Sequence, residues 1–62
     1  MNLFPTEYHL GDVIQWYGKE YIVIKFQTEG IRLRGTKNNP RGERFEIVLT
    51  EDELDKGVNG VG

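Results

Sequence analysis

The chain contains no cysteine, no serine and no alanine, and it contains one histidine. Without cysteine, neither a disulfide nor a Cys/His zinc cluster can hold its 62 residues together, so packing and hydrogen bonds must stabilise the fold. No stretch approaches the roughly 20 apolar residues of a membrane span, and the start MNLFPTEYHL lacks the pattern of a signal peptide. We therefore expect a cytoplasmic protein without membrane contact.

The missing residue types also restrict the chemistry. With His9 as the one histidine and no serine or cysteine, Ser-His and Cys-His nucleophile pairs cannot be assembled. No Gly-rich phosphate-binding loop is present, and TEDELD lacks the central glycine of a calcium loop. The carboxylates of Glu51 and Glu53 lie on a short segment that offers no pocket to shift their pKa. We expect no enzyme activity, no catalytic residue, no metal site and no cofactor.

The absence of alanine, together with apolar runs rich in valine, isoleucine and aromatic residues, favours strands over helices. The segment DVIQWYGKEYIVIKF holds two such runs around Gly18-Lys19, and glycine at the first central position of a two-residue loop indicates a type II′ hairpin. This turn places Trp16 opposite Tyr21. The same register places Ile14 opposite Val23.

Two further turns continue the pattern. A reversal at QTEG aligns Ile24 with Leu33, and a reversal in GTKNNPRGER aligns Leu33 with Ile47 and Arg34 with Glu46. The sequence therefore predicts a four-stranded antiparallel meander with one apolar face. The predicted inner face carries Val13, Ile22, Ile24, Phe26, Ile31, Leu33, Phe45, Ile47 and Leu49.

The two ends of the single predicted domain, residues 1–62, are expected to cover this face. Residues 1–9 form an N-terminal covering segment, and Leu54 follows the sheet on the other side. TEDE is a capping box in which Thr50 and Glu53 cap each other's amides, which predicts one short helical turn. The glycine-rich tail, residues 57–62, is expected to fray unless Val58 pairs as a fifth strand. The candidates for the cover are Leu3, Phe4, Tyr8, Leu10, Leu54 and Val58.

The opposite, outer face is unusual for a solvent-exposed surface. Ile14, Trp16, Tyr21 and Val23 fall together on one hairpin, and contiguous exposed apolar area tends to mark an interface. If the sheet curls tightly, the same hairpin is covered on both faces and Trp16 belongs to the core. Both interpretations remain open at this point. The predicted outer face carries Ile14, Trp16, Tyr21, Val23, Lys25, Arg32, Arg34, Arg44, Glu46 and Val48.

Charge is distributed unevenly along a chain whose net charge is −2. Basic residues dominate positions 32–44, and acidic residues dominate positions 46–55. Arg34 faces Glu46 in the predicted register, and Lys25 faces Asp12. Lys37, Arg41 and Arg44 have no predicted partner and are the best candidates for contacting an anionic molecule.

The stretch LGDVIQWYGKEYIVI, two further strands and the capped turn at TEDEL resemble the small SH3-like barrels of the KOW or Tudor kind. The resemblance covers residues 10–58 and rests on Gly11-Asp12-Val13 before a strand, Gly18-Lys19 at the hairpin and the turn near the end. It implies an all-β fold, a four- to five-stranded meander curled into a barrel. It also implies a binding module that docks on protein or nucleic acid through the aromatic hairpin and nearby loops.

The favoured functional hypothesis is an adaptor or regulator that binds a protein partner, of the kind with which phages redirect host proteins. Its predicted contact residues are Trp16, Tyr21, Val23, Arg34, Lys37, Arg41 and Arg44.

The alternative is a nucleic-acid-binding barrel in which Trp16 and Tyr21 stack on bases while the basic residues of positions 32–44 follow the backbone. A third hypothesis makes the outer face a homodimer seam.

Overall fold

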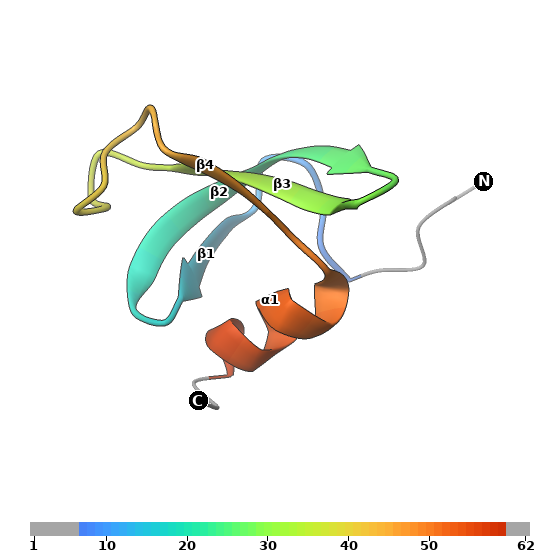
Figure 1. Ribbon diagram of the computed structural model, residues 1–62. Coiled ribbons are helices and arrows are strands. Elements are labelled where there is room, and N and C mark those ends of the chain that lie inside the picture. The colour runs from blue at the N-terminus through green and yellow to red at the C-terminus, as the bar shows by residue number, and fades with distance from the viewer. Residues whose placement is uncertain (1–6, 60–62) are drawn as a thin grey trace.

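The computed structural model describes residues 7–59 as one antiparallel sheet followed by one helix (Figure 1). The strands are β1 (Val13–Trp16), β2 (Lys19–Gln27), β3 (Gly30–Gly35) and β4 (Glu46–Leu49), and the helix is α1 (Glu51–Val58). The strands lie in the order β1-β2-β3-β4, each paired with its neighbour in the chain. The predicted four-stranded antiparallel meander is confirmed.

The first hairpin closes one residue earlier than predicted. Trp16 pairs with Lys19, so Tyr17 and Gly18 form the loop, with φ angles of 49° and 78°. Two positive φ angles define a type I′ turn, whose twist matches that of the flanking strands. The predicted type II′ turn at Gly18-Lys19 is therefore wrong, and β2 is displaced by two residues relative to β1. A two-residue displacement leaves every side chain on its original face.

A β-bulge in β2 reverses the faces. Val23 pairs with Leu33 and Lys25 with Arg32, so Ile24 is an extra residue without an opposite partner in β3. Because side chains alternate along a strand, one extra residue exchanges the faces on either side of it. The predicted Ile24–Leu33 pair is wrong for this reason. The half of β2 that precedes the bulge turns its predicted outer side chains toward the core.

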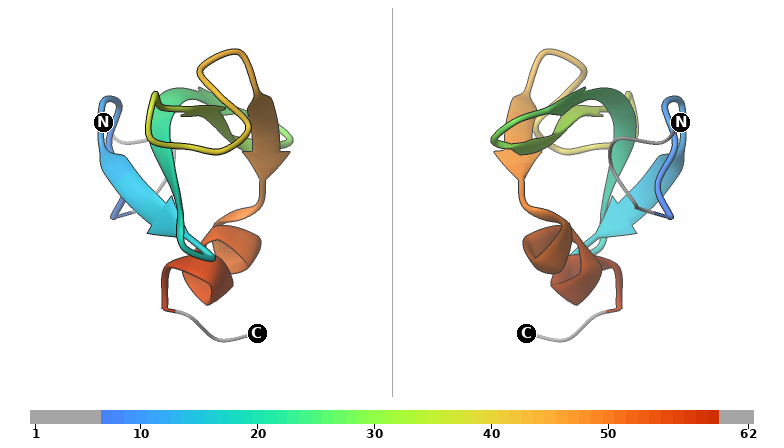
Figure 2. Two further views of the ribbon diagram at one scale, coloured as in Figure 1. Left: turned by 90° about the vertical axis from the view of Figure 1, so that its left-hand side faces the viewer. Right: turned by 90° about the vertical axis from the view of Figure 1, so that its right-hand side faces the viewer.

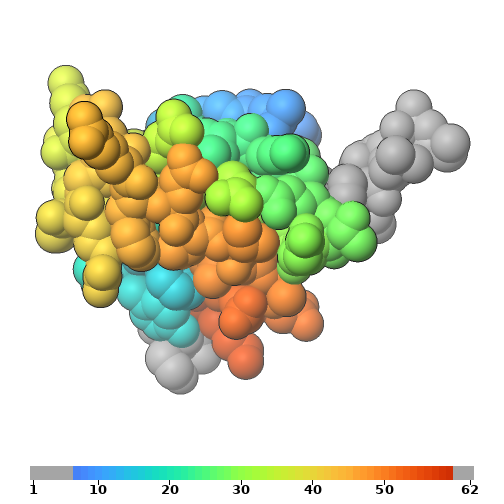
Figure 3. Space-filling view, turned by 45° about the horizontal axis from the view of Figure 1, so that its top comes forward, coloured from blue at the N-terminus to red at the C-terminus, as the bar shows by residue number. Residues whose placement is uncertain are grey.

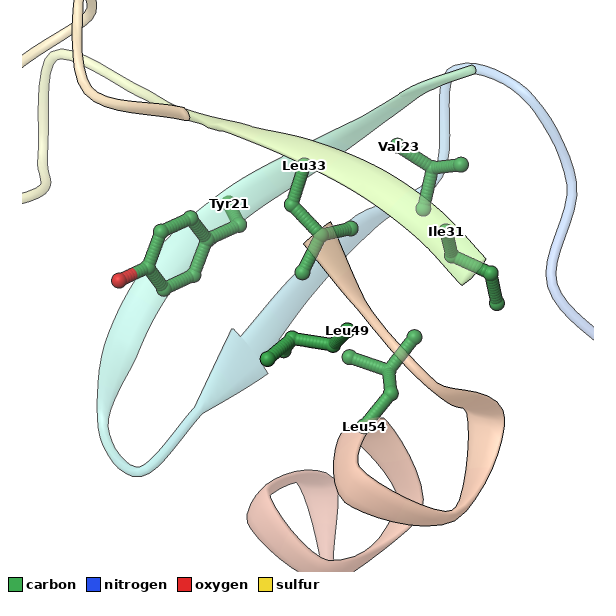
Figure 4. Close-up of a cluster of buried hydrophobic side chains, with 6 residues drawn as sticks. All are labelled: Tyr21, Val23, Ile31, Leu33, Leu49 and Leu54. Atoms are coloured by element: carbon green, nitrogen blue, oxygen red, sulfur yellow. The ribbon is translucent and has the colours of Figure 1, made fainter. Parts of the chain in front are cut away.

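The core consequently contains side chains that the sequence placed outside (Figure 4). Tyr21 is 2% exposed and Val23 is 1% exposed, so neither contributes to an outer surface. In contrast, Val13, predicted to face inward, is 58% exposed. Tyr8, Ile14, Trp16, Phe26, Phe45 and Ile47 pack around the buried cluster. The buried cluster itself consists of Tyr21, Val23, Ile31, Leu33, Leu49 and Leu54.

Of the two interpretations of Trp16, an exposed outer face or a position in the core, the structure supports packing against the core. Its side chain is half-buried, and its indole Nε1 donates a hydrogen bond to the carbonyl oxygen of Glu53 at 3.0 Å. Its ring lies edge-on to the rings of Tyr17 and Tyr21, with centroids 4.8 and 6.2 Å away. Trp16 thus joins the first hairpin to α1.

The second half of the sheet follows the predicted register. Leu33 pairs with Ile47 and Arg34 with Glu46, as the turn in residues 36–45 predicts. No bulge intervenes between β3 and β4, so the odd-numbered apolar residues of both strands share the core face.

The predicted capping box begins α1. The Thr50 hydroxyl accepts from the Glu53 amide at 3.2 Å, and the Glu53 carboxylate accepts from the Thr50 amide at 2.9 Å. The helix then runs for eight residues rather than one turn. It includes Gly57, which is buried, and Val58, so the predicted fraying from residue 57 and the fifth strand at Val58 are wrong; residues 60–62 lie outside the described residues.

Some of the residues predicted to cover the inner face pack against the core, and others are exposed. Leu54 is fully buried beneath the sheet and Tyr8 packs against the core, as expected. Leu10 is 63% exposed and Val58 is 40% exposed, so neither covers it. The predicted roles of Leu3 and Phe4 fall on residues outside the described part of the chain.

The sheet is strongly bent, but within residues 7–59 it is open and does not close into the barrel that the sequence predicts. Figure 2 shows β1 and β4 on opposite sides of the molecule with α1 beneath them. Each edge strand pairs with one neighbour within residues 7–59, and α1 packs against both. Within the same residues no helix has the length and apolar character needed to cross a membrane.

The contact between Gly57 and Trp16 leads to a prediction that opposes helix propensity. Replacing an exposed helical glycine by alanine typically stabilises a protein by about 1 kcal/mol. At Gly57 the added methyl group would lie 2.1 Å from Cδ1 and Nε1 of Trp16. We therefore expect Gly57→Ala to lower the free energy of unfolding by roughly 1–3 kcal/mol, measured by urea denaturation. Lys56→Ala, an exposed change in the same turn, should have almost no effect, and equal stability of the two variants would contradict the packing role of Trp16.

Candidate functional site

The segment between β3 and β4, residues 36–45, projects from one end of the sheet, away from α1 (Figures 1 and 3). We call it the β3–β4 loop. It contains Lys37, Arg41 and Arg44, three of the predicted contact residues, and the fourth basic one, Arg34, lies in β3 just before it. The structure therefore brings the four basic contact residues to one end of the molecule, while Trp16, Tyr21 and Val23 lie in or against the core.

A buried asparagine shapes this loop. Asn39 is 4% exposed, its Nδ2 donates to the carbonyl oxygen of Glu20 at 2.8 Å, and its Oδ1 accepts from the amide of Arg41 at 2.8 Å. The amide of Gly42 donates to the Asn39 carbonyl oxygen at 2.9 Å, and Gly42 has a φ of +85°. Buried polar groups of this kind fix a loop because leaving them unpaired is costly. The loop is thus a shaped feature anchored on β2.

The Glu20 carboxylate provides a second anchor. It accepts from the Thr36 hydroxyl at 2.6 Å, from Asn38 Nδ2 at 2.9 Å and from Gln15 Nε2 at 3.2 Å. The hydrogen bonds from Thr36 and Asn38 are the main reason that the pKa of Glu20 is lowered, and Lys37 contributes through its charge. Glu20 therefore stays ionised and holds the start of the loop.

Arg34 belongs to an ion-pair cluster on the outer face. The Glu46 carboxylate accepts from Arg34 Nη2 at 2.7 Å and from Arg32 Nη1 at 3.0 Å, so two guanidinium groups share one carboxylate. The predicted pairing of Arg34 with Glu46 is confirmed, while Asp12 binds the amide of His9 instead of facing Lys25. The cluster keeps a net positive charge, and the Arg34 side chain remains 50% exposed.

Lys37, Arg41 and Arg44 form no such ion pair with any residue that the structure describes. Within residues 7–59, no carboxylate lies within 4.0 Å of the charged groups of Lys37, Arg41 or Arg44. The Arg41 guanidinium lies over the Phe45 ring, 4.8 Å from its centroid, which holds it by a cation–π contact. Their charge is therefore available to a binding partner.

Two shallow hollows connect these cations. One, of about 580 Å³, is lined by Lys37, Arg41, Gly42, Glu43 and Arg44. The other, of about 340 Å³, reaches from Lys37 and Glu43 to Thr36 and Arg34. The hollows share Lys37 and Glu43, so the four basic residues Arg34, Lys37, Arg41 and Arg44 form one continuous surface, which we call the basic loop surface. Its geometry suits contact with carboxylates or phosphates by arginine forks.

Sequence reasoning missed the residues that position this surface. Asn39 and Glu20 belong to no recognisable sequence motif. An asparagine followed by another turn residue is typical of any loop, so the sequence does not indicate that Asn39 is buried. Among residues 7–59 there is no group of three or more histidine, aspartate or glutamate side chains placed to hold a metal ion.

No family model, no curated protein and no solved structure matches this chain.

The role of Asn39 is testable. Asn39→Ala leaves the Arg41 amide without its partner and the Glu20 carbonyl oxygen with the Thr36 amide alone, so we expect roughly 1–3 kcal/mol of lost stability by urea denaturation. Hydrogen exchange of the Arg41 amide should also accelerate. Asn38→Ala removes one hydrogen bond to an exposed carboxylate and should leave that exchange rate nearly unchanged; equal rates in both variants would show that Asn39 does not organise the loop.

The ion-pair cluster predicts a pH dependence. Hydrogen bonds from Arg34 and Arg32 lower the pKa of Glu46 below its ordinary value of 4.5, so the unfolded chain binds protons more readily than the folded one. The resulting stability is fully present above pH 4.5 and is lost as the pH falls below this value and through the lowered pKa of the folded state. Urea denaturation between pH 6 and about 3 should show a shallower decline for Glu46→Gln than for the parent protein. Parallel declines would show that Arg32 and Arg34 do not stabilise the Glu46 carboxylate.

Proposed function

We propose that this protein is a non-enzymatic binding module, an adaptor or regulator, whose basic loop surface docks on an acidic patch of a protein partner. The observation that carries the proposal is that Lys37, Arg41 and Arg44 project on an anchored loop without a carboxylate within ion-pair distance in residues 7–59. Charged residues at an interface mainly set the association rate and the choice of partner. The partner's chemistry is thus an exposed cluster of carboxylates.

The aromatic part of the sequence hypothesis needs revision. Tyr21 and Val23 are buried, and Trp16 is engaged with α1, so these residues act by holding the sheet that carries the loop. Arg34, Lys37, Arg41 and Arg44 remain as contact residues. The proposed homodimer seam loses its motivation as well, since its apolar residues form the core.

A protein partner is favoured over nucleic acid on two grounds. The aromatic rings proposed for base stacking, Trp16 and Tyr21, are committed to packing, and the net charge of −2 works against a phosphate backbone. The acidic first turn of α1, with Glu51, Asp52 and Glu53, adds to that repulsion. Nucleic acid remains the second candidate because arginine forks fit phosphates equally well.

The relation to SH3-like modules of the KOW or Tudor kind also stays a proposal. The bent meander and the capped helix after its last strand support it, while the open sheet departs from a closed barrel. A cytoplasmic location and a phage-type regulatory role remain predictions from sequence.

The test compares two classes of anion on one protein. We would titrate the ¹⁵N-labelled chain with a hexaglutamate peptide and with a short single-stranded DNA, each at low and near-physiological salt. The proposal expects amide shifts at Lys37, Arg41 and Arg44 with the peptide. DNA shifts at the same amides should vanish at the higher salt, because phosphate contacts weaken steeply with ionic strength.

Matched variants locate the contact. Arg41→Ala with Arg44→Ala should weaken peptide binding roughly 5- to 30-fold, which corresponds to about 1–2 kcal/mol for two exposed charge contacts. Lys25→Ala with Lys56→Ala removes the same charge at exposed positions outside the basic loop surface and should have a smaller effect. DNA binding that persists at near-physiological salt, or equal losses in the two double variants, would overturn the proposal.

A further inference from the structure

The free edge of β1 is a second feature that the basic loop surface does not use. β1 pairs with β2 on one side, and within residues 7–59 no strand pairs with its other side. The amide of Val23 donates to the Asp12 carbonyl oxygen at 2.9 Å, which fixes Asp12 as a hydrogen-bonded position. Such positions alternate along an antiparallel pair, so Ile14 also bonds to β2. The backbone N–H and C=O groups of Val13 and Gln15 then point to the free edge.

A groove accompanies this edge. It has a volume of about 440 Å³ and lies between the start of β1 and the last turn of α1. Val13 and Val58, 58% and 40% exposed, supply apolar surface on its two sides. An unpaired strand edge beside exposed apolar side chains is the arrangement that accepts an extended peptide as an additional strand. The lining residues are Glu7, Tyr8, Asp12, Val13, Ile14, Asp55, Val58 and Asn59.

The charge of the groove selects the kind of peptide. Glu7, Asp12 and Asp55 line it, and no lysine or arginine of the described part of the chain does. Asp55 accepts a hydrogen bond from the Tyr8 hydroxyl, and Asp12 accepts one from the amide of His9, so both carboxylates are held in place. Burial and the Asp55 carboxylate raise the pKa of Tyr8, which keeps this phenol a hydrogen-bond donor. The groove is therefore complementary to basic side chains.

A second copy of the chain fits this edge poorly. Pairing two β1 strands about a two-fold axis would bring the acidic grooves of both copies together, and like charges placed opposite each other are destabilising. The charges thus favour a foreign basic segment over self-association.

We propose that the β1 edge binds an extended, basic segment of a protein partner, which adds to the sheet as a fifth strand. Backbone hydrogen bonds to Val13 and Gln15 supply the register, apolar side chains of the segment contact Val13 and Val58, and its lysine or arginine residues face Asp12 and Asp55. The site is independent of the basic loop surface, since it lies at the opposite edge strand from β4 and carries the opposite charge. The two proposals can therefore fail separately.

The experiment uses a defined probe. An N-acetylated, C-amidated peptide of about eight residues, with valine and lysine alternating, is titrated into the ¹⁵N-labelled full chain. We expect amide shifts at Val13, Ile14, Gln15 and Val58, and slower hydrogen exchange of the Val13 and Gln15 amides in the complex. A peptide with glutamate in place of lysine should bind much more weakly.

Two pairs of variants separate the backbone contribution from the charge contribution. Val13→Pro removes the outward N–H at a position where an edge strand tolerates proline, and should weaken binding roughly ten-fold. Val13→Thr keeps the N–H and the branched shape and should lose much less binding than Val13→Pro. Asp12→Asn with Asp55→Asn should weaken binding roughly 3- to 10-fold and reduce its salt dependence. Asp52→Asn with Glu29→Gln makes the same charge change elsewhere and should have a smaller effect.

Several results would overturn the inference. Equal binding by Val13→Pro and Val13→Thr would exclude strand addition, and equal binding of the glutamate peptide would exclude the acidic groove as the selector. The absence of shifts at β1 up to millimolar peptide would exclude the site. Sedimentation of the free protein as a dimer that Val13→Pro dissociates would assign the edge to a second copy of the chain.

Discussion

The β-bulge at Ile24 is the constraint on which the rest of the structure depends. It lets Tyr21 and Val23 share a face with Ile31 and Leu33, although an uninterrupted strand would send the two pairs to opposite sides. A chain of 62 residues has few large apolar side chains, and their burial is its main source of stability. The bulge places Tyr21 and Val23 of the first hairpin in the core, and it interrupts the pairing of β2 with β3 at one position.

In a closed barrel, pairing between the first and last strands encloses the core. Here α1 packs against β1 and β4 and covers the core instead. Leu54 is buried beneath the strands, Trp16 donates to the Glu53 carbonyl oxygen, and the amide of Tyr17 donates to the Gly57 carbonyl oxygen at 3.1 Å. These contacts tie the first hairpin to the end of the chain without any pairing between β1 and β4. Because α1 covers the core from beneath, the edge of β1 keeps backbone groups that no other strand of residues 7–59 pairs with, and that a closed barrel would have used.

Sequence reasoning recovered the features that are encoded locally. The strand order, the register between β3 and β4, the pair of Arg34 with Glu46 and the capping box at Thr50 each depend on residues close together or on a short turn. It failed where distant packing decides the outcome. No residue near Ile24 predicts a bulge from the local sequence. The bulge is favoured by the burial of Tyr21 and Val23, and this burial exists only in the folded sheet. Tyr17 at positive φ was missed for a similar reason, since its amide and ring contacts to other elements offset an unfavourable backbone conformation.

The use of the large apolar residues for packing also limits the kinds of partner that the two proposed sites can recognise. Trp16 and Tyr21, the aromatic residues that would usually anchor an interface, are committed to the core and to α1. The groups that remain for binding at the two proposed sites are the cations of an anchored loop, the backbone of an edge strand and a few carboxylates. The charged contacts among these are strongly screened by salt and contribute more to encounter and orientation than to lasting affinity. Because the basic loop surface and the acidic β1 groove carry opposite charge, a partner whose own surface is divided between acidic and basic segments would be oriented by both at once. Two weak contacts joined in one partner gain from effective concentration, so such a module needs no deep pocket to bind selectively.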